Sequence, residues 1–327
     1  MNATIERAIA YLDQYEQNWP LSGNVLIAQN GEIVFEKSLG YANLEHAIAN
    51  RPSTKFGIWS ITKSFTAMSL ALLEENKRLR LDDHLSDYIP SFKRYEPITI
   101  RQLMQHTSGM PNFTSLPEFN SMWNKWTLAP DKWLQLLDDK PLHFSPGTAF
   151  SYNNTGYYLL GKIIEMVSGE PFHQFVQRRI LDPLEMKDTG VNDGKTVITG
   201  LASPYQASGG EPRPCEFVEM STVSAAGGMY STAQDLLKWD QSFYTGQLLA
   251  ADKLSYWLDL ETEGYGLGWF QDSKFGKKRI FHGGAYRGYR SELHRFPEEN
   301  ATIILLTNYD YIPVTKIADA LGGSFVG

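Results

Sequence analysis

The sequence has very little cysteine and no long apolar run. Cys215 is the only cysteine among 327 residues, so the chain cannot form an internal disulfide. No stretch reaches 18 uninterrupted apolar residues, and we therefore predict that no segment spans a membrane. Lys and Arg form no cluster and the net charge is −7, which argues against nucleic acid or an anionic membrane surface as a partner.

Several kinds of catalytic motif are absent as well. The chain has no G-x-S-x-G turn of the kind that carries the serine of α/β-hydrolases. Cys215 lies in "PRPCEFV" with no histidine beside it, so we interpret it as structural. The histidines are scattered rather than clustered, and we expect no metal and no cofactor. They are His46, His84, His106, His143, His173, His282 and His294.

The N-terminal segment "MNATIERAIAYLDQYEQNW" is acidic and amphipathic and lacks the apolar core of a secretory signal. For the chain as given we expect a cytoplasmic location, or a secreted or periplasmic one if a leader has been removed. The same segment predicts a helix over residues 4–17.

Strand patterns lie near both ends of the chain. "NVLIAQNGEIVFEKSLGYAN" holds two apolar runs joined by Asn30-Gly31, the strongest short signal for a β-hairpin. Near the C-terminus, "YGLGWFQD", "RIFHGGA" and "SELHRFPEENATIILLTN" read as strands, with "PEEN" as a turn. A short helix is expected after Pro313.

Helical patterns dominate between these ends. Helices are expected over residues 60–76, in "NTGYYLLGKIIEMVSGE" with its Ser168-Gly169 stop, and in "STAQDLLKWDQSFYTG" with its Ser/Thr cap. We predict an α+β fold, in which 1–80 and 211–327 form a discontinuous domain with an antiparallel sheet flanked by helices. Residues 81–210 would form an inserted, mostly helical domain, with the active site between the two.

A serine and a lysine lie three residues apart at the start of the first internal helix. In "FGIWSITKSF", Ser60 and Lys63 therefore point the same way. A serine hydroxyl becomes a nucleophile when a neighbouring base takes its proton, and a lysine with a lowered pKa is such a base. The alternative is that Ser60 only caps the helix while Lys63 lies in solvent.

Two more short patterns contain groups that handle protons or bind carbonyls. Tyr152-x-Asn154 precedes a helix in "FSYNNTGYYLLG", where a tyrosine could act as a general base and an amide could orient a substrate. His282 is followed by Gly283 and Gly284, whose lack of side chains would let a substrate lie along the strand edge.

The order and spacing of these three patterns resemble the class C β-lactamase-like family of penicillin-recognising serine hydrolases. The likeness extends from about residue 22 to 308 and includes "LMQHTSGM", "GGMYSTAQDLLKW" and "HGGAYRGY". It implies a β-lactamase/transpeptidase-like fold, with Ser60 as nucleophile and Lys63 and Tyr152 as the proton-handling pair. It also implies an oxyanion hole from the backbone N–H groups of Ser60 and Ala285. Asn154, His282, Gly283, Gly284 and Ala285 would line the substrate site.

The third motif departs from that of true β-lactamases, which place a permanent cation there. His282 would be mostly neutral at pH 7. Arg287 or Arg290 could supply the charge if its side chain faces the pocket, although both could also be surface residues. Trp123, Trp126, Phe113 and Phe119 could wall an acyl pocket or simply pack their own loop.

We therefore expect a serine hydrolase, and a carboxylesterase first. The alternatives are a D-stereospecific peptidase (a DD-carboxypeptidase or D-aminopeptidase), a weak β-lactamase, and a penicillin-binding sensor that deacylates slowly. The partner would be a small-molecule ester, amide or β-lactam. The sequence leaves open whether the protein is a monomer or a dimer.

Overall fold

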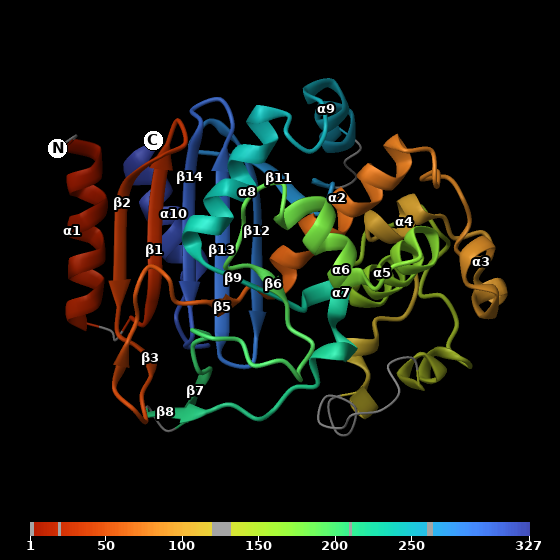
Figure 1. The fold of residues 1–327 in the computed structure, drawn as a ribbon, viewed down its shortest axis with the longest axis horizontal. Helices are drawn as coiled ribbons and strands as arrows, with labels where there is room; N and C mark the ends of the chain where they lie inside the picture. The colour runs from red at the N-terminus through yellow and green to blue at the C-terminus, as the bar shows by residue number, and fades with distance from the viewer. Residues whose placement is uncertain (1–2, 19–20, 120–131, 209–210, 260–263) are drawn as a thin grey trace.

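The computed structural model describes residues 3–18, 21–119, 132–208, 211–259 and 264–327. Its main feature is a seven-stranded antiparallel sheet that unites strands from both ends of the chain (Figure 1). In spatial order the strands are β10 (Tyr265–Gly266), β11 (Trp269–Lys274), β12 (Lys277–Tyr286), β13 (Tyr289–Phe296), β14 (Ala301–Thr307), β1 (Gly23–Gln29) and β2 (Glu32–Leu39). The predicted joining of the two ends is confirmed, because β1 pairs with β14 along its whole length.

The hairpins of this sheet are those that the sequence predicts. Asn30 and Gly31 connect β1 to β2 with φ angles of 54° and 78°, the positive values that Asn-Gly turns favour. The "PEEN" turn connects β13 to β14, which pair antiparallel.

Each face of the sheet carries its own hydrophobic core, because successive side chains of a strand point to opposite faces. Val25 and Ile27 of β1 belong to a core shared with α1 (Ala3–Asn18) and α10 (Val314–Phe325). Leu26 and Ala28 belong to the larger core on the other face. On that face α8 (Ala233–Thr245) packs on β14 and β1 (Figure 1).

The helical half is built around α2 (Thr62–Glu75), whose first ten residues are all buried. It packs against α5 (Asn154–Ser168) and α7 (Ser224–Gly227). The predicted stop of α5 is confirmed, since Gly169 follows it in the left-handed conformation at φ 77°. The predicted cap of α8 is confirmed too, because the Thr232 side chain accepts a hydrogen bond from the Asp235 N–H.

Shorter elements complete the described part of the chain. Further helices are α3 (Leu85–Tyr88), α4 (Ile100–Met104), α6 (Phe172–Val176) and α9 (Ala251–Asp259). Short 3₁₀ helices are η1 (Trp59–Ile61), η2 (Pro90–Tyr95), η3 (Phe113–Ser115), η5 (Lys132–Leu137) and η7 (Met220–Thr222), and η6 (Gln177–Leu181) is a short π-helix. Short strands are β3 (Tyr41–Asn43), β4 (Ile48–Ala49), β5 (Phe56–Gly57), β6 (Gly190–Val191), β7 (Tyr205–Ser208), β8 (Glu211–Pro214) and β9 (Met229–Ser231).

The region expected to be helical, 81–210, also supplies strands. β6 joins β5 and β9 in a small three-stranded sheet, and β7 pairs with β8 across the expected boundary near residue 210. The division of the chain into two domains stays a prediction. Within the described ranges, no helix is both long enough and apolar enough to cross a bilayer.

Candidate active site

Ser60 lies in η1, the single turn that joins β5 to α2. β5 pairs with β9, which places this turn beside the small sheet and the end of the large one. The N-cap of α2 is Ile61, and no side chain caps the helix. The interpretation of Ser60 as a simple helix cap is therefore wrong, and its hydroxyl can face other groups.

Lys63 is fully buried in the first turn of α2, so its placement in solvent is also wrong. Its Nζ donates to the Ser60 Oγ at 3.1 Å, the Asn154 Oδ1 at 2.8 Å and the Ala226 carbonyl oxygen at 2.6 Å. All three acceptors are neutral. Burial lowers the pKa of Lys63 well below that of a lysine in water, because the ammonium loses hydration without gaining a carboxylate.

Asn154 is held from two sides. While its Oδ1 accepts from Lys63, its Nδ2 donates to the Thr114 Oγ1 at 2.9 Å and its backbone N–H donates to the Asn112 Oδ1 at 3.2 Å. These bonds fix the direction of the amide toward the lysine. Asn112 and Thr114 were not predicted from the sequence. The polar residues that follow "HTSGMP" were the only signal for them.

Tyr152 packs against Lys63, whose Nζ lies 4.8 Å from the centre of the phenol ring. Its hydroxyl is buried and forms no hydrogen bond of normal geometry with any described residue. Burial raises the pKa of the phenol, and the nearby Ser60 hydroxyl offsets this in part. Tyr152 therefore stays protonated at neutral pH, while Lys63 is the more easily deprotonated member of the pair.

His282 lies in β12 with 2% of its surface exposed. Its Nδ1 lies 2.6 Å from the Gly283 carbonyl, an acceptor, so Nδ1 carries the proton and Nε2 is free to accept from the Tyr265 hydroxyl at 3.2 Å. Burial, and then the nearby Lys63, lower the pKa of His282 to about 3. The expectation of a neutral histidine is thus supported by its surroundings.

The third motif, His282-Gly283-Gly284, and the Ala285 that follows it differ in whether they line the cavity beside Ser60. Ala285 lines the cavity beside Ser60, but His282, Gly283 and Gly284 do not. A Cβ on Gly284 would lie 2.1 Å from the Ile58 carbonyl oxygen, and one on Gly283 would lie 2.7 Å from the Glu292 carboxylate. The two glycines therefore make room for packing against Ile58 and β13, and the expectation that they also leave a path for substrate stays a prediction.

Neither candidate arginine reaches the cavity beside Ser60. The Arg287 guanidinium pairs with Glu216 at 3.3 Å, and the Arg290 Nε donates to the Asp310 carbonyl at 2.8 Å. The hypothesis that one of them replaces the missing cation at Ser60 is not supported by these contacts.

The cavity beside Ser60 has a volume of about 180 Å³. Its described lining carries no ionisable group except the Tyr286 phenol, and consists of Trp59, Ser60, Thr114, Phe119, Asn154, Val223, Ala226, Gly227, Ala285 and Tyr286. Of the four aromatic residues expected near the site, Phe119 lines this cavity. Phe113 instead stacks on Trp133 at 3.9 Å in the core, and Trp123 and Trp126 lie outside the described residues.

His106 accepts hydrogen bonds from the backbone of the loop that carries Tyr152 and Asn154. Its backbone carbonyl accepts from the Ser151 N–H at 2.9 Å, and its Nδ1 accepts from the Asn153 N–H at 3.0 Å. Its ring lies 4.3 Å from the ring of Tyr152. The predicted role in holding a loop therefore agrees with these contacts, and the loop is the one that carries Tyr152 and Asn154.

Among the described residues, no three His, Cys, Asp or Glu side chains are grouped as a metal site would require. Cys215 is partly exposed, and burial, followed by the Asp310 charge, raises the pKa of its thiol to about 11. A thiol with a raised pKa is a poor nucleophile, which agrees with the structural interpretation.

Comparison with known proteins extends the likeness to most of the chain. The pattern of the family described as Beta-lactamase matches residues 8–322. Penicillin-binding protein 4* of Bacillus subtilis is 29% identical over 309 residues, which are 88% of this chain and 68% of that protein. The chain spans 62% to 68% of the length of such curated relatives.

Solved structures agree. The octameric penicillin-binding protein homologue from Pyrococcus abyssi is 27% identical with a TM-score of 0.85, covering 98% of this chain and 77% of that one. D-amino acid amidase from Ochrobactrum anthropi, complexed with L-phenylalanine, is 25% identical with a TM-score of 0.85, covering 99% and 98%. The predicted α+β, β-lactamase-like fold is confirmed. Since the family pattern spans nearly the whole chain, this protein belongs to the Beta-lactamase family and is a serine hydrolase with that fold.

Proposed function

We propose that the protein is a carboxylesterase that hydrolyses small uncharged esters through an acyl-enzyme on Ser60. One observation supports this most strongly: the described lining of the cavity beside Ser60 contains no permanent charge. Such a cavity offers no ionic partner to the carboxylate of a peptide or a β-lactam. A neutral ester can enter it without burying an unpaired charge.

In the acylation step, the Ser60 Oγ attacks the ester carbonyl carbon and its proton passes to the neutral Lys63 amine, 3.1 Å away. The backbone N–H groups of Ser60 and Ala285, both at the cavity, donate to the oxyanion. The phenol of Tyr152 gives its proton to the departing alcohol as the carbon–oxygen bond breaks, and Lys63 then returns a proton to Tyr152.

In the deacylation step, water attacks the acyl carbon and gives its proton to the Lys63–Tyr152 pair. The bond to the Ser60 Oγ breaks, Ser60 regains a proton, and the carboxylic acid leaves. Asn154 keeps the lysine directed at Ser60 throughout, because its own amide is fixed by Thr114.

A D-stereospecific peptidase or amidase is the second candidate, favoured by the 25% identity to D-amino acid amidase. It would need a carboxylate to bind the ammonium of an amino-acid amide, or a cation to bind the carboxylate of a peptide, and neither lines the described part of the cavity. A weak β-lactamase and a slowly deacylating penicillin-binding sensor are further alternatives.

The test is an activity panel with p-nitrophenyl acetate, nitrocefin and D-alanine p-nitroanilide. We expect ester turnover in the wild type, weak turnover of the other two, and a loss of at least about 10³-fold in Ser60→Ala. Ser151→Ala, at an exposed serine beside Tyr152, is the matched control and should keep full activity. Full ester turnover in Ser60→Ala would overturn the proposal, and a preference for the anilide or for nitrocefin would select an alternative. A persistent penicillin adduct in the mass spectrum would select the sensor.

A further inference from the structure

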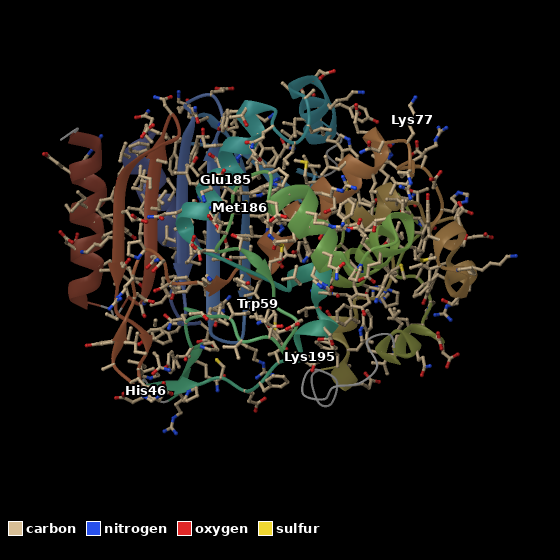
Figure 2. All side chains as sticks on the ribbon, in the orientation of Figure 1. His46, Trp59, Lys77, Glu185, Met186 and Lys195 are labelled. Carbon is tan, nitrogen blue, oxygen red and sulfur yellow. The ribbon has the colours of Figure 1, made fainter. Side chains whose placement is uncertain are left out.

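Trp59, the residue before Ser60, has a backbone conformation that tryptophan rarely adopts. Its φ is +45°, in the left-handed region, where a bulky side chain is unfavourable. Figure 2 labels it near the centre of the molecule, where the sheet meets the helical half. A glycine would fit this backbone without strain, so the backbone alone gives no reason for an indole here.

Trp59 takes part in the lining of two cavities. One is the 180 Å³ cavity beside Ser60, and the other is a second cavity of about 310 Å³. The same segments continue from one lining to the other, since Val223 and Tyr286 line the first cavity while Met220 and Arg287 line the second.

Neighbouring groups hold the indole in this position. Tyr286 meets it edge to face with ring centres 5.1 Å apart, and only 6% of Trp59 is exposed. Gly227 is also close, since a Cβ there would lie 3.4 Å from the indole Cε3. These contacts and the low exposure hold the ring in one position.

The second cavity is larger and mostly apolar. Its lining includes Ile198, Leu201, Phe217, Val218 and Tyr289, together with Cys215 and the Arg287–Glu216 pair. An apolar chain extending from a carbonyl at Ser60 would find this volume if the indole were absent.

We propose that Trp59 determines acyl-chain length by separating the Ser60 cavity from this second apolar cavity. The wild type would accept short acyl groups, and removal of the indole would open the second cavity to long or aromatic ones. This inference rests on the proposed esterase function.

The experiment compares p-nitrophenyl esters from acetate to octanoate in the wild type, Trp59→Gly and Trp59→Phe. In the wild type kcat/KM should fall steeply beyond butyrate. In Trp59→Gly, the ratio of octanoate to acetate kcat/KM should rise at least tenfold. Trp59→Phe keeps a ring at the wall and should keep a profile close to that of the wild type.

Cys215 gives a second test, since it lines the second cavity and not the cavity beside Ser60. A bulky side chain in Cys215→Trp should leave acetate turnover of the wild type unchanged and, combined with Trp59→Gly, reverse the octanoate gain of that variant. If the wild type hydrolyses octanoate as well as acetate, or if Trp59→Gly hydrolyses acetate with an unchanged chain-length profile, the inference is overturned. If the wild type hydrolyses no ester, the proposed function itself fails. Should Trp59→Gly not fold, the wild-type profile still decides.

Discussion

The two most deeply buried Lys or Arg side chains in the described part of the molecule have surroundings that differ in one respect. Lys63 on α2 and Arg295 on β13 are 0% and 1% exposed. Each lies against aromatic rings: the Lys63 Nζ is 4.8 Å from the Tyr152 ring centre, and the Arg295 guanidinium is 4.3 Å from that of Phe243. Arg295 also forms an ion pair with the buried carboxylate of Asp240, whereas the hydrogen-bond partners of Lys63 are all neutral.

The difference indicates what each cation does. A buried carboxylate keeps a cation charged, and the Arg295–Asp240 pair joins β13 to α8. A buried amine without a carboxylate is pushed toward its neutral form, which is the form that accepts a proton. We therefore expect the ion pair to stabilise the fold and, under the proposed function, the lysine to take part in the reaction.

The largest effect should come from Lys63→Met. We expect kcat/KM for the ester to fall at least about 10³-fold, because the base for Ser60 is gone. The free energy of unfolding should stay the same or rise, since a buried amine without an ionic partner is replaced by an apolar side chain of similar length. Urea unfolding and ester kinetics measure the two quantities. Lys77→Met, at an exposed lysine labelled in Figure 2, is the control. A loss of stability that accounts for the loss of activity would contradict the assignment.

Arg295→Met should give the opposite result. It leaves the Asp240 carboxylate buried without its partner, and we expect the free energy of unfolding to fall by about 3–5 kcal/mol. The fraction that remains folded should keep a kcat/KM close to that of the wild type. Lys278→Met, at an exposed lysine on β12, should change little. A stable but inactive Arg295→Met would remove the distinction between the two cations.

The sequence contains the local part of this arrangement. Ser60 and Lys63 are three residues apart on one helix, so their proximity follows from helical geometry alone. The Asn30-Gly31 turn and the Gly169 helix stop follow from backbone preferences in the same way. These rules act over a few residues, and the structure agrees with them.

Contacts between distant segments were less predictable. The neutral partners of Lys63 include Ala226, 163 residues away, which no pattern near Ser60 indicates. Arg287 was a candidate for the missing cation. Its backbone turns with a φ of +40°, and its side chain pairs with the Glu216 carboxylate at another cavity. Gly284 was predicted to leave room for substrate, and the sequence does not show that the Ile58 backbone packs against it. Only the resemblance to a family brought the three motifs together.

A third prediction uses the pH dependence of stability to test whether the buried site around Lys63 disfavours a proton on His282. The pKa of His282 is lowered to about 3, below its ordinary value near 6.5, so the unfolded chain takes up this proton first. The stability that neutral His282 contributes is complete above pH 6.5 and is lost as pH falls toward 3. In His282→Gln, the loss of unfolding free energy between pH 7 and pH 4.5 should be about 2 kcal/mol smaller than in the wild type.

Urea unfolding at the two pH values gives this difference directly. His46→Gln, at an exposed histidine labelled in Figure 2, is the control and should follow the wild type. If His282→Gln loses as much stability as the wild type, then His282 accepts its proton in the folded state, and the site tolerates charge beside Lys63.

The smallest expected effect comes from His106, whose uncharged ring holds the loop that carries Tyr152. His106 accepts the Asn153 N–H through Nδ1, and burial lowers its pKa well below the ordinary value. His106→Leu removes this acceptor, so Tyr152 and Asn154 should shift slightly relative to Lys63. We expect kcat to fall about tenfold with a smaller change in KM, since positioning rather than binding is lost.

His106→Asn is the matched variant, because an asparagine oxygen can accept the same N–H and asparagine tolerates the φ of +59° at this position. It should recover most of the kcat that His106→Leu loses. A merely structural role would lower the unfolding free energy of both variants and leave kcat per folded molecule unchanged. Recovery of kcat by asparagine alone would assign to His106 the alignment of the two groups that lie on either side of the unpaired lysine.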